Sequence, residues 1–181
     1  MKRKQSNKPV IILGAIILGV AGLGLMLYLS VRPTPPIDGV FQYPRPERGH
    51  DNSVQIAFGE LPPPGGIHHD IWQNCGVYTE PVNTGNALHS MEHGAVWITY
   101  QPDLDASQIT RLEEMVRGDG FLLLSPYPEQ RSPIVLTAWG LQLEVNSASD
   151  GRIEQFIERY RVGPQTPELG ASCAGGTGEP S

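Results

Sequence analysis

The chain has 181 residues, of which 39% are hydrophobic and 18% charged, and its formal net charge is −6 at pH 7. At roughly 100–200 residues per domain, this length allows one folded domain. All nineteen acidic residues, but only nine arginines and no lysine, lie in residues 32–181. A surface this acidic repels phosphate backbones, so nucleic acid is excluded as a partner.

The N-terminal part predicts a membrane anchor. Residues 1–9 are basic, and residues 10–31 form an uncharged apolar run. A helix of that length spans about 33 Å, enough for a bilayer core of about 30 Å. The positive-inside rule then places the N-terminus in the cytoplasm and the main domain outside it, periplasmic or at the cell surface. A cleaved signal peptide is the alternative, but Leu27, Tyr28 and Leu29 stand where its small residues are needed.

Two flanking segments have the composition of unfolded chain. Residues 32–49 contain five prolines and predict a stiff extended linker. Residues 163–181 are rich in Gly, Pro, Ser and Thr and predict a disordered tail. The folded extracytoplasmic domain is therefore expected over residues 50–162.

The elements of this domain follow from hydrophobic periodicity. Strands are expected at 95–100, 120–125, 133–138 and 141–145, which are apolar or alternate with polar residues. Helices are expected after Asp105 and after Asp150, where apolar residues recur at helical spacing. This order predicts an α+β fold, with a small, mainly antiparallel sheet, two helices on one face, and the transmembrane helix in front.

The chemistry is concentrated in residues 61–94, which hold four of the five histidines. His89 and His93 are four residues apart, so on a helix they project from the same face and could share a metal ion. His68 or the adjacent His69 could supply a third imidazole, Cys75 a thiolate, and Glu92 a carboxylate ligand or an acceptor for an imidazole N–H. The remaining histidine, His50, is expected to be solvated.

Three other interpretations of these residues remain open. Residues 89–93 also match the H-x-x-E-H zinc protease pattern, although the long helix that such enzymes need is absent from the prediction. A nucleophilic pair of Cys75 with a histidine is a further alternative. Cys75 could instead pair with Cys173 in an oxidising compartment, which would remove it as a ligand.

Several short blocks resemble a known family. They are Gly66-Ile67-His68, Gly76-Val77-Tyr78, His89-Ser90-Met91-Glu92-His93-Gly94, Ser125-Pro126-Tyr127-Pro128 and Ala138-Trp139-Gly140. Together they are similar to the domain-of-unknown-function 3105 family over about residues 54–162. The resemblance implies a membrane-anchored bacterial domain, favours His68 over His69 as a ligand, and brings no established activity with it.

The sequence therefore predicts a membrane-anchored metal-binding domain, with His68, His89, His93, Glu92 and optionally Cys75 as ligands and no catalytic residues. Copper is favoured because imidazole with sulfur suits it, and zinc is next. The expected role is metal capture, transfer or sensing. Binding should fail below the histidine pKa of about 6.5, because the ligands are neutral imidazoles. The alternatives are an accessory subunit of a membrane-protein complex with structural histidines, and a metal-dependent hydrolase with Glu92 as base.

Overall fold

The computed structural model describes residues 8–30 and 35–181, and the chain divides into two units, residues 1–36 and 37–181. The first unit contains helix α1 (Lys8–Ser30). Helix α1 lies over the segment predicted as the anchor, but among the described residues no helix is long and apolar enough to cross a membrane, which contradicts the predicted transmembrane helix. Most of the basic segment 1–9, namely residues 1–7, lies outside the described residues.

The second unit is built on one six-stranded sheet. Its strands are β1 (Val40–Gln42), β2 (Gly76–Val77), β3 (Val96–Tyr100), β4 (Leu122–Pro126), β5 (Ile134–Ala138) and β6 (Leu141–Val145). Their order across the sheet is β1-β6-β5-β3-β4-β2. The β1–β6, β6–β5 and β5–β3 pairs are antiparallel, whereas β3–β4 and β4–β2 are parallel.

The prediction of a small, mainly antiparallel sheet is wrong, because the observed sheet is larger and mixed. The local patterns locate β3, β4, β5 and β6 to within two residues of their observed starts. The parallel pair arises because β3 and β4 are joined by a crossover through helix α3 (Ala106–Val116), which is the connection that parallel strands require. The two-residue strand β2 is too short to leave a periodic pattern in the sequence.

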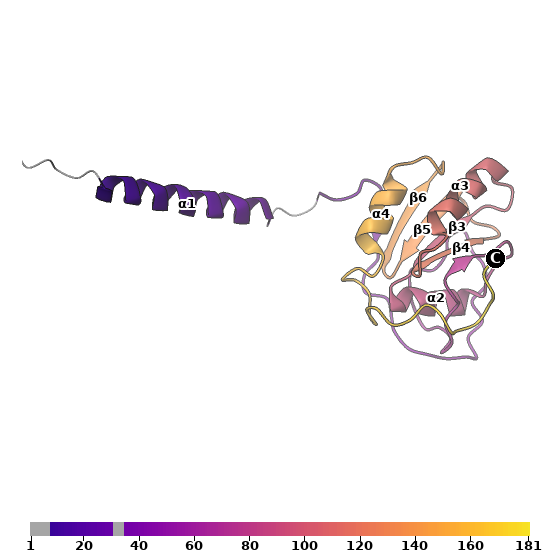
Figure 1. Cartoon of the computed structure of the whole chain (residues 1–181). Coiled ribbons are helices and arrows are strands. Elements are labelled where there is room, and N and C mark those ends of the chain that lie inside the picture. The colour runs from indigo at the N-terminus through magenta and orange to yellow at the C-terminus, as the bar shows by residue number, and fades with distance from the viewer. Residues whose placement is uncertain (1–7, 31–34) are drawn as a thin grey trace, which may run out of the picture. The chain divides into compact units, whose positions relative to one another are not determined.

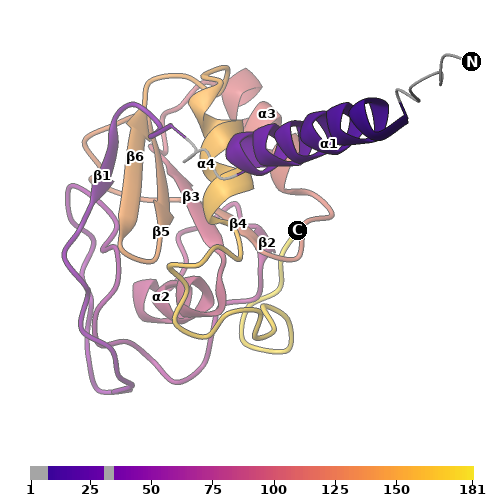
Figure 2. The same cartoon turned by 90° about the vertical axis from the view of Figure 1, so that its left-hand side faces the viewer.

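Both faces of the sheet are covered by packed side chains. On one face, α3 and helix α4 (Arg152–Tyr160) pack against alternate strand residues such as Val96 and Ile98. On the other face, helix α2 (Thr84–His93) packs its Ala87, Leu88 and Met91 against residues that include Trp97. Figures 1 and 2 show α2 apart from α3 and α4, at the end of the domain where the C-terminal segment also lies.

Residues 37–49 of the expected linker and the whole segment 163–181 are part of the folded unit, whereas residues 32–34 lie outside the described residues. β1 lies within the expected linker 32–49 and pairs with β6 at the edge of the sheet, where proline neighbours are tolerated. The expected disordered tail 163–181 is ordered as well. It is tied to the domain by a disulfide between Cys173 and Cys75 and by backbone hydrogen bonds, such as Asn74 N to Thr177 O at 2.8 Å.

The tail is ordered because it completes the end of α2. The last carbonyls of a helix have no partner within the helix. Here the backbone N–H of Glu168 donates to Glu92 O at 2.9 Å, and the N–H of Gly170 donates to His93 O at 3.2 Å. The composition of residues 163–181 predicted disorder, because composition does not show which carbonyls and which cysteine this segment contacts in the folded chain.

Candidate metal centre

Helix α2 is the platform for the candidate site. Its N-cap is Asn83, whose side chain accepts a hydrogen bond from Asn86 N, and its C-cap is Gly94 in the left-handed region with φ of 116°. A glycine is suited to that backbone conformation because it has no Cβ. The helix is buried almost throughout, so its His89, Glu92 and His93 are held by packing as well as by the helix geometry.

A loop brings two further histidines to α2. The backbones of His50 and His68 form a parallel bridge, in which His68 N donates to Gly49 O at 3.1 Å and Asp51 N donates to His68 O at 2.7 Å. The imidazole rings of His50 and His68 lie 4.8 Å apart, and both lie near His89, at 4.7 and 5.1 Å. Residues from three separate stretches of the sequence therefore meet at one point.

We call His50, His68, His89 and Glu92 the inner group. One ligand-type atom from each lies within 4.8 Å of all the others. In a tetrahedral zinc site with bonds of 2.0–2.1 Å, the ligand atoms lie about 3.4 Å apart. The atoms of the inner group lie within 4.8 Å of one another, so a pair would have to close by at most about 1.4 Å for all four to reach one ion.

The buried histidines all turn the same ring nitrogen toward the backbone. The Nδ1 atoms of His68, His89 and His93 lie 2.8, 2.8 and 2.6 Å from the carbonyl oxygens of Gly66, His69 and Ser172. A carbonyl only accepts, so each Nδ1 carries a hydrogen and donates it. In the neutral ring, Nε2 then has the free lone pair, which is the form that binds metals.

The His68 Nε2 and Glu92 Oε2 atoms face each other at 3.0 Å. Both are buried, and neither has a hydrogen-bond partner within the described part of the chain. Two buried acceptors at that distance are unfavourable unless a positive charge lies between or beside them. His50 Nε2 is also close, 3.4 Å from the same carboxylate oxygen.

The other oxygen of Glu92 is held by an arginine. Arg48 Nε donates to Glu92 Oε1 at 2.9 Å, which directs Oε2 toward the imidazoles. Burial acts to raise the pKa of Glu92, but the Arg48 hydrogen bond and the electrostatic interactions with His68, Arg48 and His50 outweigh it. The pKa of Glu92 is therefore lower than its ordinary value, and the carboxylate is ionised.

His89 is correspondingly neutral. Burial lowers its pKa. The hydrogen bond to His69 O acts in the opposite direction, and the neighbouring His93, His68 and His50 lower the pKa further. A neutral imidazole beside an ionised carboxylate is the pair of protonation states that metal binding requires.

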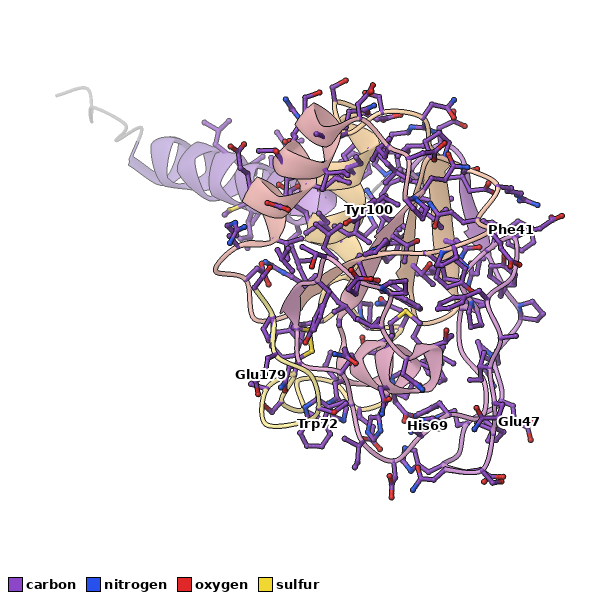
Figure 3. The ribbon with its side chains drawn as sticks, turned by 90° about the vertical axis from the view of Figure 1, so that its right-hand side faces the viewer. Phe41, Glu47, His69, Trp72, Tyr100 and Glu179 are labelled. Atoms are coloured by element: carbon purple, nitrogen blue, oxygen red, sulfur yellow. A yellow bond between two sulfur atoms is a disulfide. The ribbon has the colours of Figure 1, made fainter. Side chains whose placement is uncertain are left out.

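The structure divides the ligand set that the sequence suggested. His68, His89 and Glu92 lie in the inner group, whereas His93 faces Glu168 from the tail, with Nε2 to Oε2 at 3.6 Å. His69 lies outside the inner group, and its Nε2 is 3.0 Å from Val54 O. Figure 3 shows His69 and Trp72 at the α2 end of the domain.

The soft ligand suggested at Cys75 is excluded. Cys75 is bonded to Cys173, so it has no thiolate to offer. The same disulfide excludes Cys75 as a nucleophile. Its partner lies 98 residues away, and the sequence could present this pairing only as one alternative, because connectivity depends on the fold.

Three residues of the site were not predicted. His50 was expected to be solvated, and its side chain is 39% exposed, but it also contacts the Glu92 carboxylate, which was not expected. Arg48 lies in the supposed linker, and Glu168 lies in the supposed tail. The available signal was the cysteine in that tail, because a bridge from Cys173 to Cys75 would have brought the tail to the histidine-rich segment.

A cavity of about 780 Å³ opens on the Arg48 side of the site. Arg45, Arg48 and Trp139 are among its lining residues. The Trp139 ring also packs against His68, with ring centroids 5.7 Å apart. This side of the inner group therefore presents positive charge to the solvent.

A family model described as "Protein of unknown function (DUF3105)" matches residues 50–175. The chain belongs to this family. The matched part of the DUF3105 domain contains the whole inner group, His93, Glu168 and both cysteines. No curated protein and no solved structure matches the chain.

Proposed function

We propose that this DUF3105 domain binds one divalent transition-metal ion at the inner group and serves in capture and transfer of that ion. The observation that carries the proposal is the convergence of three imidazoles and one buried carboxylate, with His50 and His68 both within 3.4 Å of the same carboxylate oxygen. A single dication would satisfy all four groups at once. Protonation would not, because three imidazolium ions within 4.8 Å of one another would repel strongly.

The donor set narrows the choice of ion. The preference for copper rested partly on sulfur, and Cys75 is not available. Three imidazoles with one carboxylate suit zinc and copper(II), whereas calcium and magnesium take oxygen ligands. The disulfide further favours an oxidising, extracytoplasmic compartment.

The histidines could instead be purely structural, in an accessory subunit. The three Nδ1 hydrogen bonds to backbone carbonyls fit that role as well. A structural role, however, does not explain why the ligand-type atoms of His68 and His89 lie so close to those of His50 and Glu92. Orientation by Nδ1 together with convergence of the ligand atoms favours metal binding.

A hydrolase with Glu92 as general base is less well supported. A general base needs an oxygen free to accept a proton from water. In Glu92, Oε1 is held by Arg48, and Oε2 is directed into the imidazoles. This arrangement favours a ligand role for the carboxylate and therefore binding over turnover.

The proposal is tested by metal content. The full chain would be produced in an oxidising compartment, purified without chelator or affinity histidines, and assayed by elemental analysis, natively and after addition of Zn²⁺ or Cu²⁺. We expect about one ion per chain, lost when His50→Ala and Glu92→Gln are combined and retained in His69→Gln. A folded wild-type chain that takes up neither ion would exclude the metal function and leave the accessory-subunit alternative.

A further inference from the structure

A second set of ligand-type atoms adjoins the inner group. We call His89, His93 and Glu168 the outer group, since their ligand atoms also lie within 4.8 Å of one another. His93 donates Nδ1–H to Ser172 O at 2.6 Å, which leaves Nε2 facing Glu168 Oε2 at 3.6 Å. The outer group depends on the C-terminal tail, because both Ser172 and Glu168 belong to it.

His89 belongs to both groups but can bind one ion at a time. Its Nδ1 faces His69 O at 2.8 Å, so only the Nε2 lone pair is available for coordination. The rings of His89 and His93 lie 4.6 Å apart, and the ring of His68 lies 5.1 Å from His89 on the inner side. The two groups are therefore alternative positions for one ion.

The two groups differ in their access to solvent. The Glu168 side chain is 42% exposed, whereas that of Glu92 is 2% exposed. The inner group has an exposed ligand of its own in His50, but Arg48 contacts the same carboxylate and is itself 53% exposed. A cation approaching from that side meets a guanidinium, whereas one approaching the outer group meets a carboxylate.

We propose that the outer group is the entry position for the metal ion and that His89 passes the ion to the inner group. The proposal rests on the proposed function and adds a direction to it. The ion is first held by Glu168, His93 and His89. It then exchanges Glu168 and His93 for His68, Glu92 and His50, while His89 stays bound. No bond other than metal–ligand bonds forms or breaks.

The test separates the rate of loading from affinity. The metal-free full chain would be mixed with Zn²⁺, quenched with excess chelator at set times, and assayed for retained zinc. Glu168→Gln and Glu168→Lys would be compared with wild type and with Glu179→Gln, a matched acid in the same tail that lies outside both groups. Equilibrium stoichiometry and dissociation constant would be measured on the same samples.

We expect loading to slow about tenfold in Glu168→Gln and further in Glu168→Lys, within the range of electrostatic effects on association. Stoichiometry and affinity should match wild type, and Glu179→Gln should load normally. Unchanged loading in both Glu168 variants would overturn the entry role. So would a loss of affinity equal to the loss of rate, or two ions bound per wild-type chain. A wild-type chain that binds no zinc or copper would instead overturn the proposed function itself.

Discussion

The Nε2 atom of His68 lies 3.0 Å from Oε2 of Glu92, with both side chains removed from solvent. His50 approaches the same oxygen from the exposed side, at 3.4 Å. These two histidines therefore share one partner but differ in burial. This difference makes it possible to separate metal binding from stability by mutation.

His68→Ala should lower both metal affinity and stability. Removal of a fully buried ring leaves a cavity beside an ionised carboxylate, which should cost about 1–3 kcal/mol in the free energy of unfolding of the metal-free chain. His50→Ala should lower affinity while changing that free energy by less than about 0.5 kcal/mol, because the side chain is partly exposed. Urea unfolding and Zn²⁺ titration of both variants provide the comparison. Equal destabilisation by the two substitutions would contradict this account.

Arg48→Ala should weaken metal binding without removing a ligand. Arg48 orients Glu92 through the bond from Nε to Oε1 at 2.9 Å. Loss of such a supporting contact costs about 10–100-fold in metal affinity. Arg45→Ala is the matched control, since Arg45 lines the same cavity. Zn²⁺ titration of both variants tests the prediction. An equal loss of zinc affinity in the two variants would contradict the orienting role of Arg48 and indicate only the loss of a positive charge near the site.

Removal of the disulfide should destabilise the domain and loosen the tail. The bridge closes a loop of 98 residues, for which chain entropy predicts about 4–5 kcal/mol, with measured effects often smaller. The paired substitution of Cys75→Ala with Cys173→Ala should lower the urea midpoint and speed hydrogen exchange at Glu168 N and Gly170 N, which cap α2. A tail that stays protected in this variant would show that the hydrogen bonds suffice to hold it.

Gly94→Ala should be more costly than Gly118→Ala. Both glycines have positive φ, 116° and 83°, so a Cβ is strained at either position. At Gly94 the added atom would also lie 3.1 Å from the Cα of Val162, whereas at Gly118 it would meet open space. We expect an extra loss of about 1 kcal/mol in unfolding free energy at Gly94, measured by urea titration. Equal losses would mean that the chain near Val162 relaxes freely.

Acid should weaken the ion pair between Arg131 and Glu144 of β6. Hydrogen bonding from Arg131 lowers the pKa of Glu144 below its ordinary value, against the opposing effect of burial and with help from Ser132. Because the pKa is lower in the folded chain, this contribution is complete above about pH 4.5 and is lost as pH falls through the folded value. Unfolding midpoints of Glu144→Gln should fall less steeply than those of wild type between about pH 5 and pH 3. Parallel profiles would contradict the assignment.

The sequence determined the elements whose signal is local. The alternation and spacing of apolar residues indicated strands at β3 to β6 and helices at α3 and α4, because these patterns depend only on the strand and helix periods. The same local geometry placed His89 and His93 on one face of α2. The histidine-rich segment was recognisable from its composition, because it holds four of the five histidines.

Only the tertiary structure decided how distant segments meet. His50 reaches the inner group by pairing with His68, Glu168 reaches His93 because the tail caps α2, and Cys75 finds its partner 98 residues away. None of these contacts leaves a periodic pattern in the sequence. Each depends on the course of the loops and on backbone groups left without hydrogen-bond partners at the ends of other elements. Spacing could place His89 and His93 on one helical face, but the surrounding segments decided that both belong to the outer group and that only His89 also belongs to the inner group.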